Sequence, residues 1–220
     1  MNTTTTHVYF VPGMAAGVGI FSNISLPEPD YQVHVLPWLV PTKKEPLVAY
    51  AKRMAAGITH DNVVLIGVSF GGVVAQEMAQ FLSLRRIIII SSVKSKKELP
   101  RRFGVVRRSL LYKLIPTSLA LSIKDFRKLA IGPRTKKRLG LYQTYLSVRD
   151  KTYLDWAIEN MVCWSRVVAD PVVKHIHGDR DLVFPIKYIT DCEVIPGGTH
   201  VMILYKAKAV SAAIVKLIED

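Results

Sequence analysis

A serine between two glycines is the feature that most constrains how this 220-residue chain can fold. Residues 67–71 read Gly-Val-Ser-Phe-Gly, after the apolar residues 62–66 and before the helix-forming residues 72–79. This order predicts a strand, a sharp turn and a helix, with Ser69 at the turn. Glycines suit such a turn because bulkier neighbours would clash. The turn would expose the Ser69 hydroxyl and place backbone N–H groups at the helix start, where developing negative charge is stabilised.

The plainer interpretation is a glycine-rich turn with an ordinary serine, and the five-residue pattern alone does not exclude it. Two later segments favour the chemical interpretation. Residues 177–181 read His-Gly-Asp-Arg-Asp and follow the apolar residues 171–176. Residues 196–200 read Pro-Gly-Gly-Thr-His and follow residues 192–195. Each segment puts a candidate catalytic group just after a strand, and catalysis in open α/β sheets gathers at the carboxyl ends of strands.

Together with residues 10–14 (Phe-Val-Pro-Gly-Met), these segments make nearly the whole chain resemble an α/β hydrolase. The order serine, acid, histidine is also that of the family. The resemblance implies Ser69 as nucleophile, Asp181 as the acid of a catalytic triad and His200 as its base. It further implies an oxyanion hole made by the backbone N–H groups of Met14 and Phe70.

Some neighbouring residues compete with these assignments. The chain departs from the family pattern at Pro12, two residues before the Met14 donor, where many members have histidine. Asp179 competes with Asp181, but the family pattern His-Gly-x-x-Asp favours Asp181, and Asp179 would cap the turn. We expect His177 to be structural.

The implied reaction is hydrolysis of an ester or thioester of a small or medium acyl substrate through an acyl-enzyme, with amides and lactones less favoured. A binding or signalling protein that retains the fold, and a lyase or acyltransferase that uses the same residues, stay open as alternatives. No cofactor is expected. His7, His34, His60 and His175 show no metal-ligand spacing, so no metal site is expected either.

The remaining pattern alternates strands with helices, which predicts a three-layer α/β/α sandwich around a mostly parallel, six-stranded sheet. The expected strands are residues 7–11, 31–36, 62–67, 86–90, 172–177 and 193–195. The expected helices of this core are residues 44–58, 71–81 and 202–218.

Residues 95–164 form a long insertion between the fourth and fifth strands, so the core comprises residues 1–94 and 165–220. Such a segment is too long for a plain loop, and in the family this position holds a helical cap over the active site. Prolines divide it into the candidate helices 101–115, 123–131, 134–148 and 151–164. We expect Trp156 and Trp164 to pack this cap onto the sheet.

The excess positive charge lies in one region. Residues 94–140 hold fifteen Lys or Arg and two acidic residues, whereas the rest of the chain holds fifteen of each. This patch would attract anions, so the expected partner is a small acyl substrate that can itself be anionic. Residues 101–115 can also form one amphipathic helix, which suits either contact with an anionic membrane or acidic protein, or packing of the cap with a solvated basic side. Nucleic-acid binding is not expected, since no binding motif accompanies the charge.

Bulk properties suggest one globular domain in the cytoplasm. Half of the residues are apolar, which excludes a disordered chain. The first residues lack the positive charge of an export signal, and no apolar run approaches the ~20 residues that span a bilayer. Cys163 and Cys192 are expected to be reduced, partly buried thiols.

Overall fold

The computed structural model describes residues 5–114, 117 and 145–220. Six parallel strands form one sheet in the order β2-β1-β3-β4-β5-β6, and the prediction of a parallel α/β sandwich is confirmed. The strands are β1 (Thr6–Val11), β2 (Tyr31–Val35), β3 (Val63–Val68), β4 (Leu84–Ile90), β5 (Val173–Gly178) and β6 (Glu193–Ile195).

Both faces of the central strands β1, β3 and β4 are largely buried, which explains their continuous apolar runs. Successive side chains of a strand point to opposite faces. Ile87 and Ile89 of β4 therefore pack into one core, while Ile88 and Ile90 pack into the other. The register between β3 and β4 shifts between Val63 and Val64, before the four isoleucines begin.

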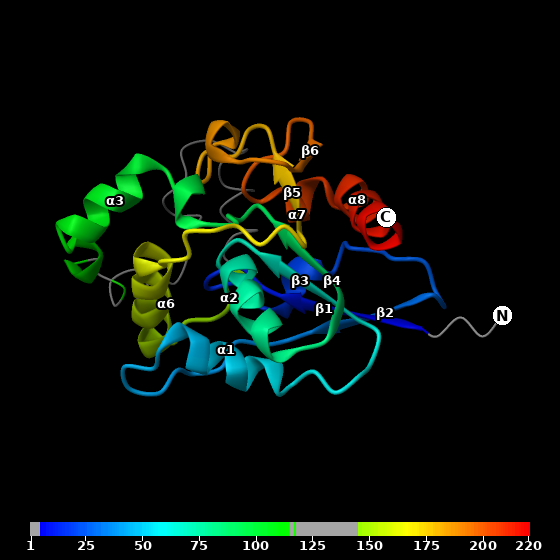
Figure 1. Cartoon of the computed structure of the whole chain (residues 1–220), viewed down its shortest axis with the longest axis horizontal. Helices are drawn as coiled ribbons and strands as arrows, with labels where there is room; N and C mark the ends of the chain where they lie inside the picture. The colour runs from blue at the N-terminus through cyan, green and yellow to red at the C-terminus, as the bar shows by residue number, and fades with distance from the viewer. Residues whose placement is uncertain (1–4, 115–116, 118–144) are drawn as a thin grey trace.

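Helices cover the two faces of this sheet (Figure 1). On one face lie α1 (Leu47–Ala55) and α2 (Phe70–Met78), which is followed by the 3-10 turn η2 (Ala79–Phe81). On the other face lie η1 (Val18–Phe21), α7 (Met202–Tyr205) and α8 (Ala207–Glu219). This arrangement makes the three layers that the sequence pattern predicts.

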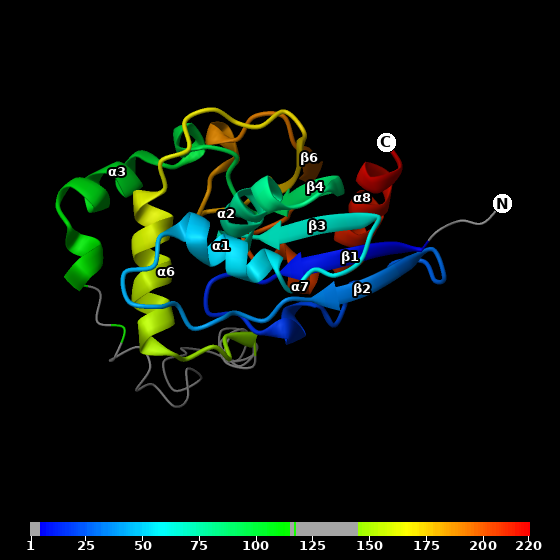
Figure 2. The same ribbon diagram turned by 60° about the horizontal axis from the view of Figure 1, so that its bottom comes forward.

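The described part of the insertion lies beyond the carboxyl ends of β1, β2 and β3 (Figure 2). It comprises η3 (Lys96–Glu98), α3 (Arg101–Arg108), η4 (Leu111–Leu114) and α6 (Lys151–Cys163). Asp150 caps α6, since its carboxylate accepts a hydrogen bond from the Tyr153 N–H. The expected helices 123–131 and 134–148 lie, apart from residues 145–148, outside the described residues. Residues 145–148 contain no extended helix.

The prediction of one amphipathic helix over residues 101–115 is wrong. Helix α3 ends at Arg108, and Leu110 follows with a positive φ of 56°. The Ser109 hydroxyl donates to the Val105 carbonyl at 2.8 Å, a local bond that competes with continuation of the helix. As a result the apolar residues do not share one face: Phe103 packs on Phe184, whereas Leu110 and Leu111 are exposed.

Two core helices also differ from the prediction. Helix α1 begins at Leu47 rather than residue 44, because Pro46 keeps an extended backbone and serves as the N-cap. The closing helix is split into α7 and α8 at Lys206, whose φ and ψ of −123° and 27° are not helical.

Both cysteines are free and half-buried, in line with the expectation for Cys163 and Cys192. Within the residues that the structure describes, no helix combines the length and apolar character needed to cross a bilayer.

Candidate active site

Ser69 lies at a strained turn between β3 and α2. Its φ of 53° and ψ of −121° fall in a region that residues with a side chain rarely adopt. The turn is fixed from the neighbouring strand: the Ser69 N–H donates to the Ile90 carbonyl at 2.9 Å, and the Ser92 hydroxyl donates to the Ser69 carbonyl at 2.7 Å. The Ser69 side chain is therefore presented at the carboxyl edge of the sheet, partly exposed.

The glycines around Ser69 are required by close backbone approaches. A Cβ added to Gly67 would lie 2.3 Å from the Gly71 carbonyl oxygen, and one added to Gly71 would lie 2.2 Å from the Pro12 carbonyl oxygen. Neither contact can be relieved by a side-chain rotation. These glycines thus let α2 pack directly on β3 and on the loop that follows β1.

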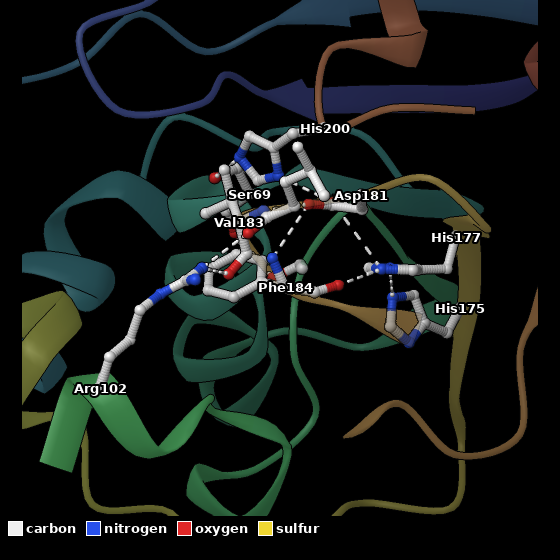
Figure 3. A network of polar contacts seen from close by, with 10 residues as sticks. Ser69, Arg102, His175, His177, Asp181, Val183, Phe184 and His200 are labelled. Carbon is white, nitrogen blue, oxygen red and sulfur yellow. Dashed lines mark hydrogen bonds and ion pairs between the residues drawn. The ribbon is translucent and has the colours of Figure 1, made fainter. Parts of the chain in front are cut away.

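The structure brings Ser69, His200 and Asp181 into one hydrogen-bonded chain (Figure 3). Ser69 Oγ lies 3.0 Å from His200 Nε2, and His200 Nδ1 lies 2.8 Å from Asp181 Oδ2. His200 stands in the loop after β6, and 22% of its side chain is exposed, while the Asp181 carboxylate is fully buried. The three predicted residues therefore meet from three separate strand ends.

The Asp181 carboxylate is held by its own loop. Its Oδ1 accepts hydrogen bonds from the N–H groups of Val183 and Phe184 at 2.7 and 2.9 Å. Burial by itself would raise the pKa of Asp181, but the hydrogen bond and charge of His200 and the Phe184 N–H outweigh it, so the pKa is lowered. Asp181 is therefore ionised near neutral pH, whereas Asp179 is exposed and lies outside this chain of contacts.

Two further histidines, His175 and His177, support the loop that holds the Asp181 carboxylate. His177 is fully buried, with Nε2 2.8 Å from the Phe184 carbonyl oxygen and Nδ1 3.0 Å from His175 Nε2. A consistent assignment has His175 donating to His177 and His177 donating to Phe184. Burial lowers the pKa of both imidazoles, and that of His175 lies well below its usual value. His177 is thus structural as predicted, but its bond with His175 was not anticipated.

Sequence reasoning also missed Arg102 of the insertion. Its guanidinium donates to the carbonyl oxygens of Leu182 and Val183, at 2.7 and 2.5 Å (Figure 3). Both acceptors belong to the loop that holds the Asp181 carboxylate. In sequence, Arg102 is one of many basic residues, and nothing local distinguishes it.

The loop after β1 lies beside Ser69, as the predicted oxyanion hole requires. A Cβ on Gly13 would lie 3.7 Å from Ser69 Cβ. The Trp38 indole N–H donates to the Gly13 carbonyl at 3.1 Å. Because a trans peptide directs its C=O and N–H to opposite sides, this bond turns the Met14 N–H away from the indole of Trp38. Within the described part of the chain, neither the Met14 N–H nor the Phe70 N–H has a hydrogen-bond acceptor.

Both tryptophans pack the insertion onto the core as expected. The Trp156 indole N–H donates to the Glu45 carbonyl at 2.7 Å, and that of Trp164 donates to the Glu77 carboxylate at 3.0 Å. Both side chains are buried. These bonds anchor α6 to the face of the sheet that α1 and α2 cover.

Comparison with known proteins agrees with the fold. The family model described as "Alpha/beta hydrolase family" matches residues 11–213, so the chain belongs to the α/β hydrolase family. Within that class, it is a member whose strand-to-helix turn carries a serine hydrogen-bonded to a histidine. No curated protein sequence matches it significantly.

Solved structures with different activities are similar in fold. A bromoperoxidase from Bacillus anthracis aligns with a TM-score of 0.68 at 17% identity, covering 99% of this chain and 93% of that one. An esterase from Exiguobacterium antarcticum aligns at 0.65 and 15% identity, with the same coverages of 99% and 93%. An epoxide hydrolase from Bacillus megaterium aligns at 0.66 and 14%, covering 99% and 94%. The TM-scores establish a shared fold. Because the sequence identities are low, the reaction has to be argued from the site.

Proposed function

We propose that this protein is a serine hydrolase that cleaves an ester or thioester of a small or medium acyl substrate. The observation that carries the proposal is the Asp181–His200–Ser69 hydrogen-bond chain, which ends at a partly exposed serine on a strained turn. An ionised Asp181 fixes a proton on His200 Nδ1, which leaves the Nε2 lone pair to accept the Ser69 proton.

In the proposed mechanism Ser69 Oγ attacks the acyl carbonyl carbon as His200 Nε2 takes the hydroxyl proton. Asp181 stabilises the imidazolium that forms, and its two backbone N–H partners keep the carboxylate oriented. His200 then gives the proton to the leaving alcohol or thiol, which produces the acyl-enzyme. Water, activated by the same imidazole, releases the acid and restores Ser69.

The oxyanion of each tetrahedral intermediate would be bound by the N–H groups of Phe70 and Met14. Phe70 is the first residue of α2, where N–H groups have no partner within the helix and the helix dipole favours negative charge. The Met14 N–H belongs to the Gly13–Met14 peptide, which the hydrogen bond from Trp38 to the Gly13 carbonyl orients. A donor of this kind contributes ~3 kcal/mol to transition-state stabilisation.

A serine-directed fluorophosphonate probe tests this proposal directly. The wild-type protein should become labelled at Ser69, and a panel of p-nitrophenyl esters and acyl thioesters should reveal turnover. Ser69→Ala should not be labelled, whereas Ser83→Ala, at an exposed loop position, should be labelled like the wild type. A folded wild-type protein that resists the probe would support the binding or signalling alternative. Acyl transfer to an added alcohol or amine in place of water would support an acyltransferase.

The exposed basic residues of α3 favour an acyl substrate with negative charge. Arg101, Arg107 and Arg108 are exposed. Their helix contacts the candidate site, because Arg102 of α3 donates a hydrogen bond to the loop that holds Asp181. Anions would be concentrated next to the site, an effect that salt screens because the Debye length falls from ~10 Å at 0.1 M to ~3 Å at 1 M.

A triple variant tests this charge effect. Replacing Arg101, Arg107 and Arg108 with glutamine should raise KM for an anionic acyl thioester and leave KM for a small neutral ester unchanged. The matched control replaces three exposed lysines elsewhere, Lys43, Lys52 and Lys208. A KM for the anionic thioester that stays at its wild-type value would remove the charge argument. Loss of binding to anionic vesicles without a change in KM would instead indicate membrane contact.

A further inference from the structure

Three histidines from separate segments lie together on the side of the sheet that α1 covers. His7 belongs to β1, His34 to β2, and His60 to the loop between α1 and β3. Each offers one ring nitrogen, and these three atoms all lie within 4.8 Å of one another. His7 Nδ1 lies 3.0 Å from His34 Nε2, and the His60 ring centroid lies 3.8 Å from that of His7.

The register of the sheet explains this grouping. In the parallel pairing of β1 with β2, His34 lies opposite Tyr9, so His7 and His34 are diagonal neighbours on one face. The chain then returns from α1 to β3 beside β1, where the His7 N–H donates to the Asn62 carbonyl at 3.1 Å. That return brings His60 over the other two rings. The three histidines come from distant parts of the sequence, which is why their spacing along the chain gave no sign of this cluster.

The chemistry of the cluster suits a cation that accepts imidazole nitrogens. The rings contact one another and Tyr9, whose Oη lies 2.5 Å from His60 Nδ1. A neutral imidazole has a free lone pair, which is the form that ligates metals.

We propose that His7, His34 and His60 bind one divalent transition-metal ion of the Zn²⁺ class. Imidazole ligands suit zinc, copper and nickel, whereas calcium and magnesium prefer oxygen ligands. Metal–nitrogen bonds of ~2.0–2.1 Å bring ligand atoms about 3.3 Å apart in tetrahedral geometry. The present spacing thus requires small side-chain rotations, which the exposed, loop-borne His60 can supply. Three imidazoles leave a fourth position for water or for Tyr9 Oη.

The site is distinct from the candidate active site. His7 pairs with Val63 at the start of β3, and Ser69 follows the end of that strand. At ~3.3 Å per residue, the two positions lie roughly 20 Å apart along the sheet. An ion bound here would join β1, β2 and the α1–β3 loop, so its expected effect is on the stability of this edge of the sheet.

Zinc binding can be measured on the full chain without a histidine tag, after dialysis against a chelator. Competition with a chromophoric zinc chelator should give one ion per chain, and Co²⁺ should produce the visible absorption of a tetrahedral site. Zinc should also raise the melting temperature, since a ligand that binds only the folded state stabilises it. Absence of zinc binding by the folded wild-type protein would overturn the proposal.

Single substitutions locate the ion. His60→Ala and His34→Gln should each weaken zinc binding about 100-fold or more, because loss of even an outer-shell partner costs roughly 10–100-fold. The exposed position of His60 makes His60→Ala the variant expected to fold normally, which its circular dichroism and metal-free melting temperature can verify. The control is His200→Gln, which removes the partly exposed imidazole of the other site and should bind zinc like the wild type. Loss of zinc binding in His200→Gln with retention in His60→Ala would place the ion at the candidate active site and contradict the proposal.

Discussion

Histidines gather on two parts of the sheet, and their ring nitrogens face different groups. At the carboxyl ends, His200 lies between a carboxylate and a hydroxyl, and His177 lies between a carbonyl and another imidazole. Near the amino ends of β1 and β3, His7 and His60 face one another and His34 of β2. In the first group, carboxylate, hydroxyl and carbonyl partners fix which ring nitrogen carries the proton. In the second group, ring nitrogens of three histidines lie close together. The proposed roles, proton transfer in one place and cation binding in the other, rest on this difference in partners.

The backbone explains the difference. Loops after β5 and β6 present N–H groups and a buried acid, so the Asp181 carboxylate stays ionised and polarises His200. The face of β1 and β2 presents side chains in register, and among the described residues no hydrogen bond or ion pair joins the three rings there to an acidic side chain. An imidazole takes its role from these partners.

The largest expected effect comes from Ser69→Ala, which separates the two regions. Ester or thioester turnover should fall by about 10⁴-fold or more, because no other group can form the acyl-enzyme. Zinc binding at His7, His34 and His60 should be unchanged. Steady-state kinetics and chelator competition on the same preparation check both outcomes. Turnover close to wild type would refute the serine mechanism.

Asp181→Asn should cost roughly 10³–10⁴-fold in kcat, since an amide no longer holds His200 in the tautomer that accepts the serine proton. Asp179→Asn is the matched control, because Asp179 is exposed two residues away, and it should turn over substrate nearly as the wild type does. The kcat values of the two variants give the ranking. The reverse ranking would assign the acid to Asp179.

Trp38→Phe should lower kcat about 10-fold with little change in KM, because it removes the indole donor that orients the Gly13–Met14 peptide. The loss is smaller than that of a donor itself, since the Met14 N–H remains. Trp164→Phe is the control: it loses a comparable indole bond to Glu77 and should affect stability alone. Equal kcat losses in both variants would indicate general loosening of the fold.

The smallest effect concerns acid stability. Burial lowers the pKa of His175 and His177, so the unfolded chain binds more protons below its own pKa of ~6.5. The free energy of unfolding should therefore fall as pH decreases from about 7.5 to 5.5, by at most about 1.4 kcal/mol per pH unit for each histidine. His175→Gln, which keeps an N–H donor for His177, should show a smaller fall. Urea unfolding at each pH measures this, and an unchanged slope would contradict the assignment.

The sequence by itself determined the alternation of strands and helices, the serine turn and the three residues that meet at the carboxyl edge. The first two features follow from short-range physics, namely apolar periodicity and the sterics of Gly67 and Gly71, so a short segment contains the information that they need. The three residues follow from strands that run parallel and so end at one edge, together with the resemblance to the family, whose pattern favours Asp181 over Asp179. The boundaries of α1 and the end of α3 were less predictable, because Pro46 and the Ser109 side chain compete with helix propensity there.

Only the tertiary structure decided which distant side chains share partners. Arg102 donates to the Asp181 loop, Trp38 donates to the Gly13 carbonyl, and His60 lies over His7. Each contact joins residues that are far apart in the sequence, and no periodic pattern predicts it. Such contacts depend on strand register and on the path of a returning loop, since a shift of one residue between β1 and β2 would place His7 and His34 on opposite faces of the sheet. The pattern of residues therefore predicted the class of the protein, and the packing of the sheet placed its histidines in two groups.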